Sequence, residues 1–486
     1  MSDLLKRESE RERRNAWRSM GRREFLGSAI GAALAAGVAP PSSVAAAAEK
    51  AGLPRPSEGR GLQTYPVRSK PSTSNGAYRE QLETPIVARH QVVVAGGGPS
   101  GVIAAAAAAR SGADTLLIER YPFLGGNGTA GLMTCYNGFR NQRPPEALQT
   151  VKGIPAEYIA ELVRLGGIIK DDPYPKSEHD VATGDLPYCV GFDPEAAKVA
   201  SLNLVKKEGV KLRLHSWVVA PMLDGSRVVG IIVESKSGRQ AIAADVVIDA
   251  TGDGDIAARA GALFMNPAQK GDRMGMSLMY RLGGLPSGIK GSYGGIRIGD
   301  RVVKWGPGFG GDGLDVENLT RAEVETRLKL WEQVQEMKRK PGMESVYLMQ
   351  TATSIGVRET HRILGEYTVT EQDAIKGTRF PDVIAISSNP MPSYHGKRFF
   401  FNHEGFEIPY RSLVPKGIEG LVLTGRCISC EQAPFQSARS MAPAMAIGHA
   451  SGCAAAMAAK DKVPPRNLDV KALQKLLLSQ NAELRM

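Results

Sequence analysis

The sequence predicts an α/β fold, in which a Rossmann-like dinucleotide-binding domain is interleaved with an α+β substrate domain that contains a mainly antiparallel sheet. Two stretches, residues 92–119 and 245–261, read as a buried strand, a glycine turn and a helix. Between the second stretch and the C-terminal region, residues 276–305 alternate apolar and polar side chains around glycine-rich turns. The nucleotide-binding chain is therefore expected on both sides of a central substrate region.

The stretch from Val92 to Gly101 reads VVVAGGGPSG and carries the most specific signal. Its glycines fit G-x-G-x-x-G, in which the first permits the tight turn, the second lets a pyrophosphate approach and the third lets the helix pack closely: Gly96, Gly98 and Gly101. A helix over 102–110 would aim its positive end at the phosphates. Glu119 ends the next strand, where an acid is needed for a ribose hydroxyl.

The N-terminal 48 residues predict a twin-arginine signal peptide. Arg22 and Arg23 precede Phe25-Leu26, a weak apolar stretch over 27–38 and alanine-rich sequence. Gly21 stands where Ser or Thr is more usual, and the alternative is a basic arm. From this motif we expect the Tat export machinery, which carries folded proteins, as a partner. We also expect a periplasmic or secreted product. Residues 49–86 read as a flexible linker.

Composition fits a large globular enzyme. The 486 residues are 42% hydrophobic, and the formal net charge of +11 is spread along the chain rather than clustered with aromatics. We therefore expect no nucleic-acid partner, and no membrane span remains once the signal is cleaved. The odd number of cysteines predicts no disulfide framework. Cys427-x-x-Cys430 is either a redox pair or, as we favour, two small residues in a turn, and no metal site is expected.

The remaining elements follow in chain order. The dinucleotide-binding domain spans 87–264, the substrate domain 265–404, the C-terminal part of the nucleotide domain 405–462, and a tail or helix 463–486. In the substrate domain, Thr320 and Glu323 predict a capping box for a helix over 320–337. Its apolar stripe is expected in the core: Val324, Leu328, Trp331 and Val334. Helices are expected at 154–165, 194–208 and 442–459, and strands at 211–220, 228–235, 240–249 and 421–426.

Together these motifs resemble the FAD-dependent oxidoreductases with a glutathione-reductase-like nucleotide domain, most of all the subgroup labelled xanthan-lyase-like. The resemblance covers about 87–460. It rests on the motifs around Val92–Gly101, Phe123–Gly126, Ala250–Asp255, Ile355–Ile363, Ile408–Pro415 and Gly425–Ser429. It implies FAD as the cofactor. No lyase motif is visible, so the subgroup label is no argument for lyase activity.

The resemblance also implies roles for individual residues. The pyrophosphate would lie on Gly96, Gly98, Ser100 and Gly101; the adenosine on Glu119, Arg120, Val218, Thr251 and Gly252; and the path to the flavin on Gly125, Gly126, Asn127, Thr129, Gly425, Arg426 and Ala444. Gln432 stands where family members commonly have a histidine, and a glutamine cannot transfer protons.

The candidate catalytic residues are therefore His395, helped by Tyr394, with Arg358 and Arg439 as binders of an anionic group. We expect hydride transfer between a small polar molecule, a carbohydrate or hydroxy acid, and flavin N5. The alternatives are a flavin-dependent reductase of an activated double bond and a flavin-carrying electron-transfer protein. Without a second G-x-G-x-x-G, the electron acceptor would be a quinone, dioxygen or another protein.

Overall fold

The structure is a computed structural model that describes residues 73–74, 77–78, 82–142, 148–169, 181–265, 274–286, 297–298, 301–394 and 397–485. The chain divides into two compact units, residues 1–81 and 82–486. In the first unit, strand β1 (Thr73–Ser74) pairs with strand β2 (Ala77–Tyr78). The predicted signal motif lies outside the described residues. All that follows concerns the second unit.

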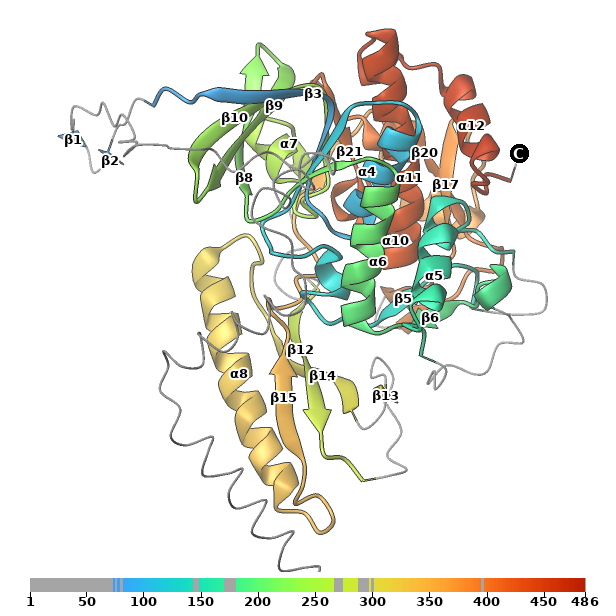
Figure 1. Ribbon diagram of the computed structural model, residues 1–486. Coiled ribbons are helices and arrows are strands. Elements are labelled where there is room, and N and C mark those ends of the chain that lie inside the picture. Colours follow the sequence, from blue (N-terminus) through green and yellow to red (C-terminus); the bar gives the residue numbers. More distant parts are fainter. Residues whose placement is uncertain are drawn as a thin grey trace, which may run out of the picture. The chain divides into compact units, whose positions relative to one another are not determined.

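The central sheet forms around the predicted strand–turn–helix unit (Figure 1). Its seven strands follow the order β7-β4-β3-β10-β9-β8, and β21 also pairs with β10. Its middle strands β3 and β4 pair in parallel, and they are rich in buried valine and leucine, as is usual for parallel strands. The bounds are β3 Ile86–Ala95, β4 Thr115–Ile118, β7 Lys211–Arg213, β8 Trp217–Asp224, β9 Arg227–Ser235, β10 Gly238–Asp249 and β21 Leu421–Leu423.

Strand β10 belongs to two arrangements at once. Its first half pairs antiparallel with β9, which continues to β8, whereas Val247–Asp249 pair in parallel with β21. Along its other edge β10 runs parallel to β3. The carboxyl ends of β3, β10 and β21 therefore meet at one edge, which is where open α/β sheets bind ligands.

Two small-residue helices pack directly on each other beside this sheet. Helix α4 spans Pro99–Arg110 and helix α11 spans Met441–Asp461. A methyl group at Gly448 would lie 2.3 Å from the backbone oxygen of Ser100, and one at Gly452 would lie 2.2 Å from that of Ala104. The alanines and glycines of both helices thus permit backbone contact that larger side chains would prevent.

The region predicted to be the substrate domain contains the expected antiparallel sheet, in the order β13-β14-β12-β15. Helix α8 (Val316–Lys338) packs against β12, β14 and β15, as Figure 1 shows. Strand bounds are β12 Met276–Gly283, β13 Arg297–Ile298, β14 Arg301–Phe309 and β15 Tyr347–Thr351.

Helix α8 differs from its prediction in start and orientation. Asp315 caps it by accepting a hydrogen bond from the Glu317 amide at 3.0 Å, while Thr320 lies one turn inside the helix. Of the four side chains predicted to lie in the core, only Val334 is buried. Trp331, for example, is 56% exposed. The buried face is Ala322, Thr326, Leu330 and Val334. Packing against the sheet decides which face of the helix is buried, and an apolar stripe alone does not predict that.

The other elements complete the second unit. Among the described residues, no helix combines the length and apolarity needed to cross a bilayer. The remaining helices are α5 Ile154–Arg164, α6 Pro194–Lys207, α7 Asp255–Arg259, α9 Glu371–Lys376, α10 Gln432–Ala438 and α12 Val470–Ser479. The remaining strands are β5 Cys135–Asn137, β6 Cys189–Gly191, β11 Phe264–Met265, β16 Arg362–Ile363, β17 Val383–Ser387, β18 Met391–Tyr394, β19 Lys397–Phe399 and β20 Phe406–Pro409.

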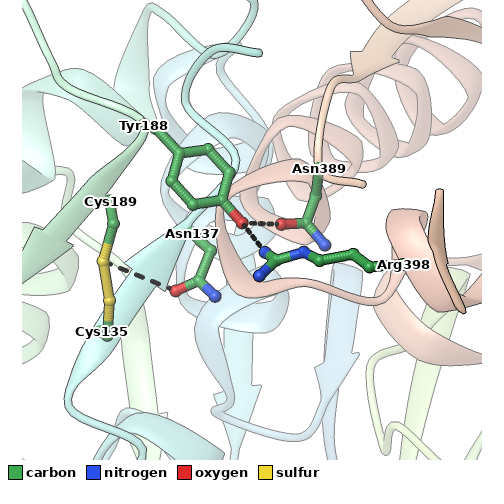
Figure 2. The surroundings of a disulfide bond; sticks show 6 residues. All are labelled: Cys135, Asn137, Tyr188, Cys189, Asn389 and Arg398. Carbon is green, nitrogen blue, oxygen red and sulfur yellow. Dashed lines mark hydrogen bonds between the residues drawn. A yellow bond between two sulfur atoms is a disulfide. The ribbon is translucent and has the colours of Figure 1, made fainter. Parts of the chain in front are cut away.

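A disulfide joins Cys135 on β5 to Cys189 on β6, which corrects the expectation of no disulfide (Figure 2). Antiparallel pairing of the two strands brings the cysteines together across 54 residues of sequence. Beside the bridge, the Tyr188 hydroxyl donates to the side-chain oxygen of Asn389 at 2.6 Å, and Arg398 donates to Tyr188 at 3.4 Å. The odd number of cysteines was misleading, because the other three are buried as free thiols.

We predict that replacing both Cys135 and Cys189 with serine lowers the free energy of unfolding by about 2–4 kcal/mol, because the bridge restricts the unfolded chain. Chemical denaturation would measure the difference. A reductant should destabilise the natural protein and leave the double variant unchanged. Five titratable thiols in the denatured, unreduced natural protein would contradict the bridge.

Candidate active site

A cavity lies at the carboxyl edge of the central sheet and is built around the glycine turn. Gly96 has φ +114°, and a methyl group there would lie 2.4 Å from the backbone oxygen of Ala250. A methyl group at Gly101 would lie 1.9 Å from the oxygen of Gly96. At Gly98, by contrast, an added methyl meets nothing within 4 Å and faces the cavity. Thus two glycines hold the backbones together, and the middle one leaves the α4 amides open to a ligand.

The following glycine loop packs on the first turn. The Gly125 amide donates to the Gly97 oxygen at 2.8 Å, and a methyl group at Gly126 would lie 2.7 Å from the α carbon of Gly98. Gly126 and Asn127 line the cavity. Thr129 instead donates its hydroxyl to the Leu124 oxygen at 2.8 Å, which stabilises the loop from outside the cavity.

Glu119 sits at one end of the cavity, held by two backbone amides. Its carboxylate accepts hydrogen bonds from Gly97 at 2.7 Å and Tyr121 at 2.9 Å. Burial raises the pKa of Glu119, and these two hydrogen bonds oppose that rise. Arg120 stacks over the ring of Trp217 nearby, and Val218 also lines this end. The arrangement presents acceptor oxygens and flat surfaces, as an adenosine requires.

The opposite side of the turn is fixed by the buried Asp249 at the end of β10. Its carboxylate accepts from the Thr251 hydroxyl at 2.7 Å and from the Ile256 and Ala257 amides at 3.0 Å each. Burial raises the pKa of Asp249, and these hydrogen bonds oppose the rise. Asp249 therefore shapes the loop that carries Thr251 and Gly252 to the cavity wall.

Arg426 ties this loop to the C-terminal part of the nucleotide domain. It donates to the Gly252 oxygen at 2.9 Å and to the Val357 oxygen at 2.8 Å, and it forms an ion pair with Asp253. Its neighbour Gly425 has φ +69° and lies close to the Ser100 side chain. Arg426 thus joins three segments along the cavity wall.

The substrate-domain sheet supplies the facing wall. Met279 and Trp305 from β12 and β14 line the cavity together with Ser277. Arg358 stacks over Trp305 at 4.8 Å from the ring centre and donates to the Ser277 hydroxyl at 2.7 Å. Burial lowers the pKa of Arg358. The cavity therefore lies between the two sheets, and one sheet contributes the nucleotide-binding turn.

The short segment between helices α10 and α11 closes the far end. Arg439, Met441 and Ala444 line the cavity there, so the start of α11 faces it as predicted. The positive end of a helix stabilises nearby negative charge. Shielding from water lowers the pKa of Arg439 to about 9, and the neighbouring charges of Arg358 and Arg426 contribute to this effect.

The structure brings most of the predicted cofactor residues onto one wall: Gly96, Gly98, Ser100, Glu119, Arg120, Gly126, Asn127, Val218, Thr251, Gly252, Gly425, Arg426 and Ala444 line the cavity. Gly101, Gly125 and Thr129 lie behind it and position the others. The roles of these residues remain predictions.

The predicted catalytic residues are divided. Arg358 and Arg439 line the cavity, whereas His395 lies outside the described residues and only the backbone of Tyr394, on β18, is described. Gln432, which stands where the family resemblance led us to expect a histidine, donates to Glu359 at 3.2 Å. Both Cys427 and Cys430 are buried thiols, and burial raises their pKa values, which agrees with the structural interpretation.

Sequence reasoning missed the aromatic and polar residues that approach from the other sheet. Trp305, Ser277 and Met279 lie in a strand pattern that predicted structure but no ligand contact. Trp217 and Tyr121 were also missed, although a tryptophan in a predicted strand beside the adenosine end is a usable signal. Which strands of a second sheet face a cavity depends on domain packing, and no local motif records that.

The fold and the cavity define a Rossmann-type flavoprotein with a second, antiparallel domain. The chain belongs to the FAD-dependent oxidoreductase family, whose model matches residues 91–305 and 295–477. It is an oxidoreductase with FAD as its cofactor. The site fits that cofactor, because the open face at Gly98 leaves room for a pyrophosphate and Glu119 offers acceptors for a ribose. Among curated proteins, none matches the chain.

Several solved structures match the chain at low sequence identity. A geranylgeranyl bacteriochlorophyll reductase-like protein from Thermoplasma acidophilum is 16% identical over 82% of this chain and 84% of its own, with a TM-score of 0.42. A myxobacterial chondrochloren halogenase, described as FAD-dependent, is 16% identical over 81% and 79%, with a TM-score of 0.42. The p-nitrophenol 4-monooxygenase of Pseudomonas putida is 13% identical over 81% and 84%, with a TM-score of 0.39.

We predict that Gly98→Val lowers FAD affinity by about a hundredfold while the protein stays folded. The side chain would point into the cavity and displace the pyrophosphate from about two amide hydrogen bonds, each worth ~1.5 kcal/mol. Flavin absorbance after dialysis, with circular dichroism for the fold, would measure both effects.

Two variants serve as controls for this prediction. Gly310→Val also adds a side chain where nothing lies within 4 Å, but outside the cavity, so FAD content should not change. Gly101→Ala should instead lower the melting temperature, because its methyl group meets the Gly96 backbone. A Gly98→Val protein with full flavin content would show that the turn does not bind the cofactor.

Proposed function

We propose that the protein is an exported dehydrogenase or oxidase that transfers hydride between a small polar substrate, a carbohydrate or hydroxy acid, and flavin N5. The observation that carries the proposal is the cavity itself, whose wall joins the nucleotide-binding turn to polar and aromatic side chains of a second sheet. FAD, when bound, supplies a two-electron redox centre at the isoalloxazine ring. A carrier of electrons alone would need no such second wall.

The chain's own residues would bind, orient and exclude water. Trp305 and Met279 provide apolar surface, while Arg358 and Ser277 provide donors beside it. Proton transfer at the substrate hydroxyl needs a base, and among the described lining residues there is no histidine. His395 therefore remains the proposed base by resemblance. Gln432 cannot take this role, although it stands where the resemblance implies a histidine. Membership of the xanthan-lyase-like subgroup is proposed on the same sequence motifs.

The first alternative is a flavin-dependent reductase of an activated double bond, since the same cavity could accept hydride transfer in the outward direction.

We predict that anaerobic mixing of the holoprotein with hydroxy acids or sugars bleaches the oxidised flavin band. Stopped-flow absorbance would record the bleaching. Failure of every hydroxylated compound, together with rapid reoxidation of pre-reduced protein by an enoate, would favour the reductase.

Export is proposed from the twin-arginine motif. The Cys135–Cys189 disulfide supports it independently, because disulfides persist in oxidising compartments such as the periplasm. A protein that takes up FAD in the cytoplasm must cross the membrane folded, which the twin-arginine route permits. Of the proposed acceptors, quinone and dioxygen can both reach such a compartment by diffusion.

We predict that replacing Arg22 and Arg23 together with lysine abolishes export while keeping the charge of the segment. Cell fractionation and N-terminal sequencing of the mature protein would test this. A variant with Lys6 and Arg7 exchanged for arginine and lysine is a matched control and should be exported normally. Unchanged periplasmic yield from the double-lysine protein would rule out the proposed route.

A further inference from the structure

The cavity wall carries more positive charge than its neighbouring carboxylates balance. Besides Arg120, which lies beside Glu119, three arginines line it, and of these three Arg426 is paired with Asp253. Among the described residues, neither Arg358 nor Arg439 has a carboxylate within salt-bridge distance. A buried guanidinium without an anion is costly, since desolvation is not offset by a partner.

Arg439 is the less satisfied of the two. Its Nε is fully buried and has no hydrogen-bond partner in the part of the chain that the structure describes. The side chain keeps a partial opening toward the cavity that it lines. The nearest acid in electrostatic terms is Glu359, which already accepts hydrogen bonds from Gln432 and from the Met274 amide, each at 3.2 Å.

Arg358 is held in place but not neutralised. One nitrogen donates to the Gly275 oxygen, another donates to Ser277, and Trp305 supports the flat face of the guanidinium. These partners fix the orientation of the fork, and they are neutral groups. Arg358 is therefore a preoriented cation on the wall that belongs to the substrate domain.

The position of the pair separates it from the expected phosphates. The pyrophosphate would lie at the α4 amides, beside Gly98 and close to Gly425, which is near Ser100. Arg358 lies against β12 and β14, and Arg439 follows helix α10. A second anion, distinct from those of the cofactor, would balance the charge of these two arginines.

We propose that Arg358 and Arg439 bind a carboxylate of the substrate, so that the substrate is a carboxylic acid rather than a neutral sugar. This inference rests on the proposed function and narrows its substrate class. A carboxylate has two coplanar oxygens, which match the flat donor forks of arginine. It would place the reacting carbon between Trp305 and the start of α11, where the helix dipole stabilises negative charge.

The test titrates the holoprotein with acetate, glycolate and benzoate, each compared with its neutral amide, and with inorganic phosphate. Flavin difference spectra and isothermal titration calorimetry give the dissociation constants. The natural protein should bind at least one carboxylate about tenfold or more tightly than its amide, the usual scale for a charge-assisted hydrogen bond. Arg439→Gln and Arg358→Gln should each remove this preference while FAD content stays complete.

Arg411→Gln is the matched control, since Arg411 lies outside the cavity in an ion pair with Asp382 and its loss removes the same charge. It should leave carboxylate binding unchanged. Equal binding of acids and amides, or binding of none of the three carboxylates, overturns the proposal, as does a stronger response to phosphate. Loss of FAD from Arg439→Gln with carboxylate binding intact per flavin would assign the arginines to the cofactor. A colourless natural protein would instead refute the proposed function.

Discussion

Backbone contact at the first glycine turn is the constraint on which the rest of the structure depends. Gly96 lies against Ala250 at the end of β10, Gly101 lies against Gly96, and Gly448 of α11 lies against Ser100. These contacts bring strand, turn and two helices together at distances that exclude a side chain. A cavity for a dinucleotide results because the segments meet there, and the α4 amides are exposed beside Gly98, where an added methyl group would meet nothing within 4 Å.

The second wall is organised in a different way, by side chains. Arg426 links the loops that carry Gly252 and Val357, and Arg358 joins its own segment to the substrate-domain sheet through Ser277 and Trp305. Arginine suits this task because its five donors satisfy several backbone oxygens at once. The two domains are therefore coupled through charged side chains beside the cavity, so a change of ligand charge there would affect both.

How well the sequence predicted each feature depends on how far apart in the chain the interacting residues lie. The turn around Gly98 could be predicted because its glycines, helix and acid lie within 30 residues, and because neighbouring residues determine its geometry. The orientation of α8 could not, since Trp331 and Ala322 lie on different faces and only the sheet decides which is buried. The Cys135–Cys189 bridge was missed for the same reason, because pairing between strands that are far apart in the sequence leaves no local pattern.

Cofactor binding depends on backbone contacts, whereas substrate choice depends on side chains. Substitution at Gly96 or Gly101 would disturb backbones that hold the central sheet, so the nucleotide-binding half tolerates little change. At Trp305 and Arg439 the side chain itself forms the wall, and exchange there alters shape or charge without breaking a backbone contact. A family that shares the first half can therefore accept different substrates through the second. In this chain the second half combines unneutralised guanidinium groups with a helix start, and that combination favours a negatively charged ligand.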